Sequence, residues 1–358
     1  MSDLFWRDRT VFITGHTGFM GGWLALWLQQ LGAKVVGYAL PPPTVPNLFE
    51  VARVADGMTS LQGDIRDLPH LRSALADCRP EIVFHLAAQS LVRHSYADPL
   101  ETYATNVMGT AHVLEAVRGI SSVRAVLCVT SDKCYENREW LWGYREDEAM
   151  GGFDPYSSSK GCAELVIAAY RRSYFHPARY AEHGVSIASA RVGNVIGGGD
   201  WAEDRLVPDV IRALSVRQPI NVRNPQAIRP WQHVLEPVAG YLLLARMLLG
   251  ETGSAFAEGW NLGPGEDDVW SVSRLVERLA ALWGDGPGWE RDSGDHPHEA
   301  QCLKLDCAKA RTRLGWAPRW ALERGLQATV DWYRAYREGA DMRALTLAQI
   351  EQFRKSGT

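Results

Sequence analysis

Short runs of strand-forming residues alternate with longer stretches of helical periodicity through the first half of the chain. The strand-like runs are rich in Val, Ile, Phe and Thr and cover residues 10–14, 34–38, 58–62, 81–85, 125–129 and 185–190. Apolar residues recur as on one face of a helix in 19–31, 67–77, 100–118 and 156–174. This alternation predicts an α/β protein with a Rossmann-like, doubly wound parallel sheet and helices on both faces.

The pattern changes after Val192. Residues 193–199 (GNVIGGG) are rich in glycine, and residues 219–230 have a loop-like composition. At 358 residues the chain is long enough for two domains. The expected parts are a first domain over 1–192, to which 230–262 returns, a smaller mixed α/β substrate-binding domain from 193–229 and 263–335, and a C-terminal helical tail over 336–358.

Composition excludes several kinds of partner. Lys and Arg total 38 and Asp and Glu total 42, a formal charge of −4, which argues against a protein that coats nucleic acid. The most apolar stretch, residues 238–249, is too short to cross a bilayer and contains Arg246, so we expect no membrane span. The first residues also lack the apolar segment of a signal peptide.

The six cysteines stand far apart and form no CxxC pair. This spacing predicts neither a disulfide framework nor a zinc site, so we expect no bound metal. Together with the absence of a signal peptide, it favours a cytoplasmic protein in a reducing environment.

A glycine-rich turn follows the first strand-like run directly. Gly15, Gly18 and Gly21 lie in TGHTGFMG, at the start of the helical stretch. Gly15 permits a tight turn, Gly18 lets the backbone approach a pyrophosphate, and Gly21 allows the helix to pack closely on the strand. Because a helix N-terminus favours an anion, the first domain is predicted to bind a dinucleotide.

Two later segments support this prediction. Asp64 follows the third strand, where a carboxylate could hold the adenine amino group, and residues 86–88 (Leu-Ala-Ala) follow the fourth, where small side chains admit a cofactor. The second strand ends in residues 38–40 (Tyr-Ala-Leu), with neither a carboxylate for the adenosine ribose nor an Arg for a 2′-phosphate. We expect NAD rather than NADP, although this strand end leaves the choice open.

A tyrosine and a lysine share one helix face in YSSSK. Tyr156 and Lys160 stand four residues apart. A lysine ammonium there, like the positive ring of an oxidised nicotinamide, can lower the pKa of the phenol. The tyrosine can then take a proton from an alcohol while hydride leaves its carbon.

Ser131, Asp132 and Lys133 follow the fifth strand-like run. Residues just past the carboxyl ends of parallel strands border the ligand crevice. A hydroxyl there can bind an alcohol, and a carboxyl beside an ammonium supplies one possible acid and one possible base. The alternative is an ordinary turn with a surface ion pair.

The motifs together resemble those of the extended short-chain dehydrogenase/reductases. The resemblance runs over nearly the whole chain, through TGHTGFMGGW, GDIRD, HLAAQ, NVMGT, TSDKCY, YSSSK and ARVGNVIGGGDW. Within that superfamily the chain resembles the sugar-nucleotide 4,6-dehydratases. The Asp132-Lys133 pair, TVPNLFE at 44–50 and GGGDWAEDRLVPD from Gly197 are similar to the CDP-glucose branch, whereas dTDP-glucose dehydratases carry Asp-Glu and epimerases Ser/Ala-rich residues at that pair.

The resemblance implies a reaction. Tyr156 would take the proton of the sugar 4-hydroxyl while hydride passes from C4 to NAD, and the new ketone would acidify the C5 hydrogen. Asp132 would protonate the departing 6-hydroxyl, and Lys133, neutral when it acts, would remove the C5 proton. Hydride would then return to C6 and give the 4-keto-6-deoxy sugar, with the cofactor still bound.

The resemblance also implies the residues of the site. Catalytic residues would be Ser131, Asp132, Lys133, Tyr156 and Lys160. Residues that bind NAD would be Gly15, Thr17, Gly18, Phe19, Met20, Gly21, Asp64, Ile65, Leu86, Ala87, Ala88, Asn106, Val129, Tyr156 and Lys160. Residues that bind the nucleotide sugar, expected to be CDP-glucose, would be Gln89, Ser90, Asn194, Arg205, Leu206, Arg229 and His298. The arginines supply the local cations that a diphosphate needs.

Other functions share part of this pattern. Another nucleotide-sugar 4,6-dehydratase, or an NAD-dependent nucleotide-sugar epimerase, would have the same fold, cofactor, Tyr156 and Lys160, although Asp132-Lys133 argues against an epimerase. A non-catalytic NAD-binding regulator often lacks the Tyr/Lys pair. The helices over 100–118 and 156–174 resemble those that form a four-helix bundle in family dimers, so we expect a homodimer or homotetramer.

Overall fold

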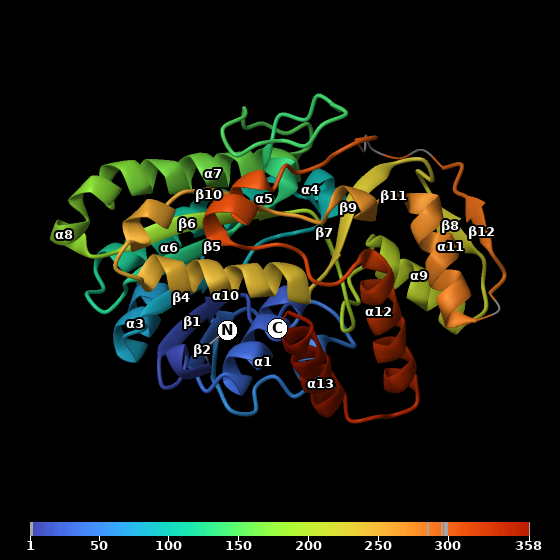
Figure 1. The fold of residues 1–358 in the computed structure, drawn as a ribbon, viewed down its shortest axis with the longest axis horizontal. Coiled ribbons are helices and arrows are strands. Elements are labelled where there is room, and N and C mark those ends of the chain that lie inside the picture. The colour runs from blue at the N-terminus through green and yellow to red at the C-terminus, as the bar shows by residue number, and fades with distance from the viewer. Residues whose placement is uncertain (1–2, 285, 295, 297–299, 358) are drawn as a thin grey trace.

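Seven parallel strands form the central sheet of the computed structural model, which describes residues 3–284, 286–294, 296 and 300–357. Neighbouring strands follow the order β10-β6-β5-β4-β1-β2-β3 (Figure 1). Their bounds are β1 Thr10–Thr14, β2 Lys34–Ala39, β3 Thr59–Gln62, β4 Ile82–His85, β5 Ala125–Val129, β6 Ser186–Val192 and β10 Gly259–Leu262. The order reverses between β1 and β4, where a doubly wound sheet opens a ligand crevice. The predicted fold class is confirmed.

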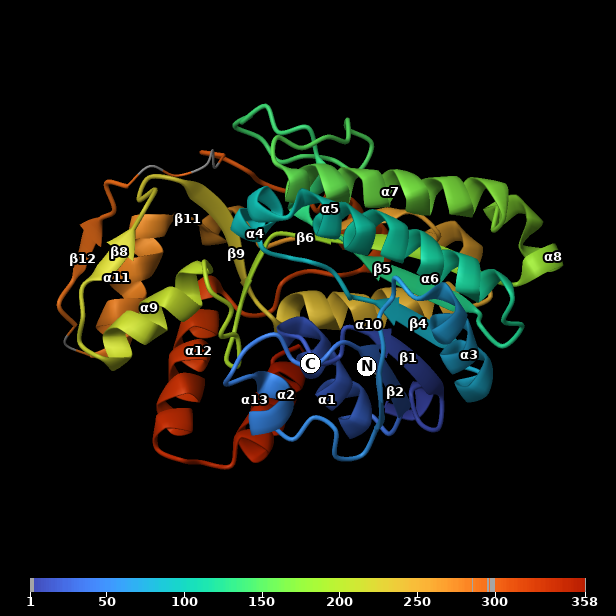
Figure 2. The same ribbon diagram turned by 180° about the vertical axis from the view of Figure 1, so that it is seen from behind.

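Helices cover both faces of the sheet (Figures 1 and 2). One face packs against α1 and α10, and the other packs against α3, α6 and α7. The helices are α1 Phe19–Gln30, α2 Leu48–Val51, α3 Leu68–Cys78, α4 Val92–Ala97, α5 Pro99–Tyr103, α6 Gly109–Arg118, α7 Pro155–Ser173, α8 Tyr180–His183, α9 Leu206–Ser215, α10 Leu235–Leu249, α11 Val272–Trp283, α12 Leu322–Arg337 and α13 Met342–Lys355. A π-helical turn, Ala104–Met108, joins α5 to α6.

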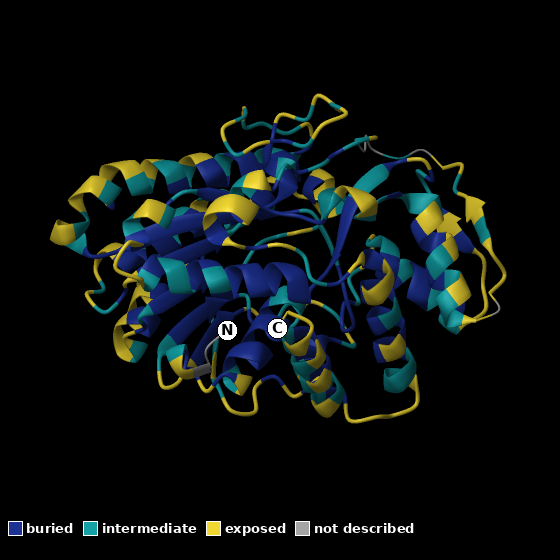
Figure 3. Cartoon of the chain, viewed as in Figure 1, coloured by how far each residue is buried: buried dark blue, intermediate teal, exposed yellow. Residues whose placement is uncertain are grey.

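The alternation of side chains along a strand decides which core each one joins. In β1, Val11 and Ile13 belong to the core beneath α1 and α10, whereas Phe12 belongs to the core beneath α3 and α6. All three are fully buried, as in parallel strands that are covered on both faces. Figure 3 shows the same depth of burial along the central strands and α10. Coverage of the sheet on both faces explains why the strands appear in the sequence as nearly continuous apolar runs.

Two small sheets lie to one side of the central sheet. β7 Asn194–Ile196, β9 Ile228–His233 and β11 Val269–Ser271 form the first, in the order β11-β9-β7, and β8 Ile220–Val222 pairs with β12 Trp289–Arg291 in the second. The expectation of a loop over residues 219–230 is therefore wrong, because this segment holds β8 and the beginning of β9. A three-residue strand with Asn at its centre is too short to show periodicity.

After β9 the chain goes back to the central sheet. α10 packs on β5 and β6, and β10 adds to the sheet edge beside β6. β9 itself belongs to the small sheet. The division of the chain into two domains and a tail stays a prediction.

The two C-terminal helices, α12 and α13, pack against earlier parts of the chain. α13 lies beside α1 (Figure 1). On α13, Arg343 donates hydrogen bonds to Gln29 Oε1 at 2.8 Å and to the Asp56 carbonyl at 2.9 Å. On α12, Tyr333 OH accepts the N–H of Asp200 at 3.1 Å. Helix α12 thus supports the end of the glycine-rich segment that follows β7.

Three features of the described residues bear on partners and ligands. No helix among them is long and apolar enough to cross a membrane. No three His, Cys, Asp or Glu side chains in this part of the chain are grouped to hold a metal ion. All six cysteines fall within it and are free thiols.

Candidate active site

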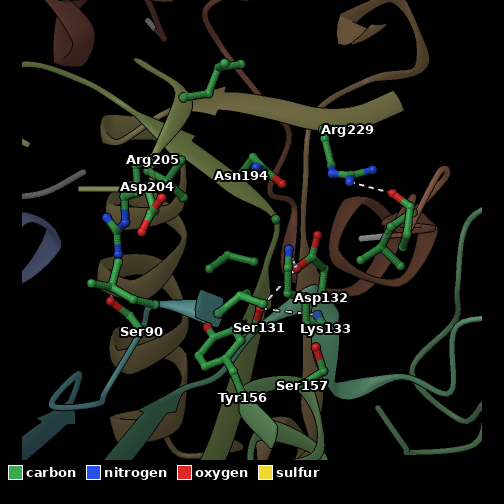
Figure 4. A pocket seen from close by; sticks show the side chains of 18 of the residues that line it. Ser90, Ser131, Asp132, Lys133, Tyr156, Ser157, Asn194, Asp204, Arg205 and Arg229 are labelled. Atoms are coloured by element: carbon green, nitrogen blue, oxygen red, sulfur yellow. Dashed lines mark hydrogen bonds and ion pairs between the residues drawn. The ribbon is translucent and has the colours of Figure 1, made fainter. Parts of the chain in front are cut away.

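A pocket of about 710 Å³ lies at the carboxyl ends of β1, β4, β5 and β6. Residues that follow these strands line it, including Met20, Leu86, Ser131 and Asn194. The opposite wall comes from the small sheets and α9. Figure 4 shows Ser131, Asp132, Lys133 and Tyr156 close together, with Asn194 facing them. The pocket therefore lies at the switch point of the sheet, where such folds bind ligands.

The glycine-rich turn is built for close backbone approach. Gly15 has a φ of +80°, in the left-handed region that favours glycine. A Cβ on Gly15 would lie 2.7 Å from Ala87 N, and a Cβ on Gly21 would lie 2.1 Å from Gly15 O. Gly18 is the N-cap of α1 and provides no side-chain cap, so the first N–H groups of the helix remain available to an anion. These residues fit the pyrophosphate of a dinucleotide.

The other predicted cofactor residues divide into two groups. Those that line the pocket are Phe19, Met20, Leu86, Ala88, Val129, Tyr156 and Lys160. Asp64, at the end of β3, instead binds its neighbour Arg66, with 2.6 Å between Oδ2 and Nη2. Thr17 donates to Leu40 O at 2.9 Å, and the Ile65 side chain is buried against Gly109.

Asn106 and Gln89 face the protein rather than the pocket. Asn106 Oδ1 accepts the N–H of Gln89, and its Nδ2 donates to Gln89 O, both at 2.9 Å. The Gln89 side chain donates to Thr102 Oγ1 at 2.9 Å. The structure thus places both residues where they fix the segment after β4, and neither lines the pocket.

Ser131, Asp132 and Lys133 form a compact cluster in a short 3-10 turn. Ser131 Oγ donates to Asp132 Oδ1 at 3.0 Å and accepts the N–H of Lys133 at 3.2 Å. Lys133 Nζ lies 3.8 Å from Asp132 Oδ1. The Asp132 side chain is 1% exposed, and its Oδ2 has no hydrogen-bond partner among the described residues. Since a buried oxygen without a partner is unfavourable, a substrate hydroxyl in the pocket can stabilise it.

Tyr156 and Lys160 are placed by the start of α7. Asp154 caps the helix by accepting the N–H of Ser157 at 2.9 Å, and Pro155 fits its first position. Lys160 Nζ lies 5.9 Å from the centre of the Tyr156 ring. Burial raises the pKa of Tyr156 to about 12, although a hydrogen bond with Ser131 lowers it in part. Burial also lowers the pKa of Lys160 to about 8.

The expected lowering of the Tyr156 pKa by Lys160 is not found. Desolvation of the buried phenolate is the largest cause of the raised pKa, and it outweighs the lowering by the Ser131 hydrogen bond and by the charge of Arg205. The phenol therefore holds its proton in the protein alone, and only further positive charge beside the ring would change that.

Two predicted substrate residues contact each other across the pocket. Arg205 Nη2 donates to Ser90 Oγ at 2.7 Å, and Arg205 Nη1 pairs with Asp200 Oδ2 at 2.9 Å. Ser90 follows β4, whereas Arg205 immediately precedes α9 (Figure 4). The contact brings together segments 115 residues apart, so Arg205 has a fixed position at the pocket wall.

The remaining predicted substrate residues also have defined positions. Arg229, on β9, lines the pocket and donates to the carbonyls of Ile228 at 2.9 Å and Ala300 at 2.5 Å. Asn194 lines it from β7, and its buried Oδ1 has no hydrogen-bond partner in the part of the chain described. Leu206 also lines it. His298 lies outside the described residues.

Sequence reasoning missed an ion-pair cluster at the pocket. Arg93 on α4 and Arg223 just after β8 both pair with Asp204, at 3.1 Å and 3.6 Å. All three side chains line the pocket, and Asp204 has a φ of +61°. Since they come from distant segments without a shared motif, no signal in the sequence brings them together.

Comparison with known proteins decides the family. A family model described as GDP-mannose 4,6 dehydratase matches residues 12–329. The chain belongs to this dehydratase family. It is 55% identical over 354 residues to the CDP-glucose 4,6-dehydratase of Salmonella typhimurium, with 99% of this chain and 98% of that protein covered. It is 27% identical over 346 residues to the dTDP-glucose 4,6-dehydratase of Xanthomonas campestris pv. campestris, with 90% and 93% covered.

Solved structures share the fold of this dehydratase. The dTDP-glucose 4,6-dehydratase of Streptomyces venezuelae, solved with NAD, gives a TM-score of 0.78 at 24% identity and covers 92% of this chain and 98% of its own. The UDP-glucose 4-epimerase of Thermotoga maritima, solved with UDP-glucose, gives 0.76 at 22% identity and covers 92% and 99%. Because dehydratases and epimerases share the fold, fold alone does not separate the two reactions.

Proposed function

We propose that this dehydratase converts CDP-glucose to CDP-4-keto-6-deoxyglucose with NAD as its cofactor, as a hydro-lyase. The observation that carries the proposal is the 55% identity with the Salmonella CDP-glucose 4,6-dehydratase over 99% of the chain. The gathering of Ser131, Asp132, Lys133 and Tyr156 in one pocket supports it. The predicted resemblance to the CDP-glucose branch agrees with this relative.

The residues of the pocket fit NAD. Gly15 and Gly21 leave room that a Cβ would fill, and the N-terminus of α1 offers N–H groups to a pyrophosphate. β2 ends at Ala39 without an arginine that could bind a 2′-phosphate, which favours NAD over NADP. When bound, NAD accepts hydride from C4 of the sugar and returns it to C6, so the reaction has no net redox change.

The side chains of the pocket move the protons. Tyr156 takes the proton of the 4-hydroxyl, which requires positive charge near its ring because burial holds its pKa at about 12. Lys133 removes the proton from C5, made acidic by the C4 ketone, and returns one there after the reduction at C6. Asp132 gives its proton to the departing 6-hydroxyl, which leaves as water.

The proton balance links Tyr156 to Asp132. One cycle leaves Tyr156 with an extra proton and Asp132 without one, so a proton must pass between them, directly or through solvent, before the next cycle. Ser131 is hydrogen-bonded to both residues and is suited to carry it.

The nucleotide diphosphate needs local cations and amide groups. Arg205 and Arg229 lie on the pocket wall, where charge-assisted hydrogen bonds to phosphate oxygens are strongest. Asn194 offers a buried Oδ1 that a hydroxyl of the substrate can satisfy. We assign these residues, with Ser90 and Leu206, to the nucleotide-sugar site.

Product mass tests the reaction. Purified protein with CDP-glucose and NAD is expected to give a nucleotide sugar lighter by one water, with a new carbonyl. A product of unchanged mass would indicate an epimerase and overturn the proposal. Asp132→Asn is the matched control, since it keeps the shape of the side chain but has no acidic proton.

We further propose that the protein is a homodimer or homotetramer in the cytoplasm. Leu100 on α5, Met108 in the π-helical turn and Leu165 on α7 expose apolar side chains that a second copy can cover. The free thiols fit a reducing compartment. Light scattering after gel filtration is expected to show an oligomer and a smaller species for Leu165→Glu; a monomeric parent protein would contradict this proposal.

A further inference from the structure

A buried charged network lies next to the catalytic residues. Its charged members, Glu164 and Arg191, are not among the residues that line the pocket, although Thr130 is. Its centre is Glu164, one helical turn after Lys160 on α7. The Glu164 carboxylate accepts hydrogen bonds from Thr130 Oγ1, from Ser189 Oγ at 2.8 Å and from Arg191 Nη2 at 2.9 Å. Thr130 follows β5, and Ser189 and Arg191 belong to β6. One carboxylate thus joins α7 to the residue that follows β5 and to β6.

Glu164 is ionised and held firmly. Burial alone would raise its pKa, but the Arg191 guanidinium and the hydrogen bonds outweigh burial and hold the pKa below its ordinary value. Arg191 is fixed in turn by Tyr135 OH at 2.7 Å and by the Glu146 carbonyl at 2.9 Å. Because every donor is supplied by the folded core, the carboxylate can act as a rigid anchor.

Thr130 connects this anchor to the catalytic residues. It stands immediately before Ser131 and Asp132, and its backbone N–H donates to Ala190 O at 2.8 Å. Its hydroxyl donates to Glu164. The end of β5 is therefore held by the neighbouring strand and by α7, and Ser131 and Asp132 extend into the pocket from that end.

We propose that Glu164 is a positioning residue for the reaction, which acts through Thr130 to fix the end of β5 so that Ser131 and Asp132 meet the sugar in reactive geometry. The inference rests on the proposed dehydratase function and adds to it a residue that touches neither substrate nor cofactor. Since a displacement of about 1 Å at a catalytic group can lower a rate about a hundredfold, one hydrogen bond at this place has a large effect.

The chain offers a matched pair of variants. Thr130→Val and Ser189→Ala each remove one hydroxyl donor from Glu164 and leave its ion pair with Arg191 intact. Both side chains are buried, but only Thr130 adjoins the catalytic residues. We expect both variants to lower Tm by similar amounts. Only Thr130→Val should lower kcat, by about 10- to 100-fold with KM nearly unchanged, and Thr130→Ser, which keeps the hydroxyl, should restore kcat.

A second readout needs no substrate. Hydrogen–deuterium exchange of the peptide that carries residues 130–135 is expected to be faster in Thr130→Val than in the parent protein, and unchanged in Ser189→Ala. Equal kcat and equal exchange in the two variants would overturn the positioning role, as would a Thr130→Ser variant that stays slow.

A failure of the proposed dehydratase function can be distinguished from a failure of the positioning role of Glu164. If the parent protein turns over another nucleotide glucose, the kinetic comparison is made with that substrate and still decides the role of Glu164. If the parent turns over none, the exchange experiment decides it.

Discussion

Substitution of Lys133 distinguishes two possible roles of this residue. Lys133 is either the base that removes the C5 proton or only a cation that lies beside Asp132. Lys133 Nζ lies 3.8 Å from Asp132 Oδ1, and the side chain is 28% exposed at the pocket. Lys133→Met removes both the charge and the base and keeps most of the length of the side chain. Lys133→Arg keeps the charge, but a guanidinium does not give up its proton in proteins.

The expected magnitudes differ between stability and rate. Lys133 is partly exposed but Asp132 is buried. Lys133→Met therefore leaves a buried carboxyl group without its cation and should lower the free energy of unfolding by about 1–3 kcal/mol, whereas Lys133→Arg keeps the charge and should keep Tm within a few degrees of the parent protein. A general base contributes about 10²- to 10⁴-fold in rate, or about 2.7–5.4 kcal/mol of barrier. Both variants should therefore lose product formation by that factor.

The assay uses CDP-glucose deuterated at C5. The parent protein is expected to exchange the label with solvent during turnover, whereas Lys133→Met and Lys133→Arg should retain it and still oxidise C4. Lys133→Arg with the parent rate and the parent loss of label would refute the assignment, because charge without basicity would then suffice.

Three further variants test other parts of the account. Tyr156→Phe removes the group that takes the 4-hydroxyl proton, so kcat should fall about 10²- to 10⁴-fold while Tm is kept; steady-state kinetics that match the parent protein would contradict this role. Gly21→Ala would put a Cβ 2.1 Å from Gly15 O, so the turn must shift and NAD affinity should fall at least about tenfold; titration calorimetry on cofactor-free protein measures it, and equal affinity would argue against the cradle. Glu236→Gln tests a buried carboxyl whose pKa burial raises to about 7, well above the unfolded value of about 4.3. The contribution of Glu236 to stability is present below pH 4 and is lost as the pH rises through 7. The free energy of unfolding of the parent protein, relative to that of the variant, should therefore fall by roughly 3 kcal/mol between pH 4 and pH 8. Urea titrations that give a constant difference across this range would contradict the raised pKa.

The sequence predicts the parallel strands because strands that are covered on both faces have nearly continuous apolar runs. The run TVFIT predicts a strand at residues 10–14, and β1 has those bounds. The glycine-rich turn and the YSSSK motif could also be recognised in the sequence, since the residues of each motif are close together in the chain. The short strand β8 was missed because three residues carry no period.

Contacts between distant segments could not be predicted. Nothing in the sequence indicates that Arg205 binds Ser90 or that Asn106 holds the backbone of Gln89, because both contacts depend on how the sheet brings loops together. The raised pKa of Tyr156 could not be predicted for the same reason, because it depends on how the chain packs around the ring. Its burial follows from packing, and burial is the largest cause of the raised pKa.

Turnover of a panel of nucleotide sugars tests the central claim most directly. Purified protein with NAD is incubated with CDP-, dTDP-, UDP- and GDP-glucose, and the 4-keto-6-deoxy product is quantified for each. We predict that CDP-glucose is dehydrated with a kcat/KM at least about tenfold above the others, a preference of about 1.4 kcal/mol. No turnover of CDP-glucose, or a clear preference for another nucleotide, would contradict the account.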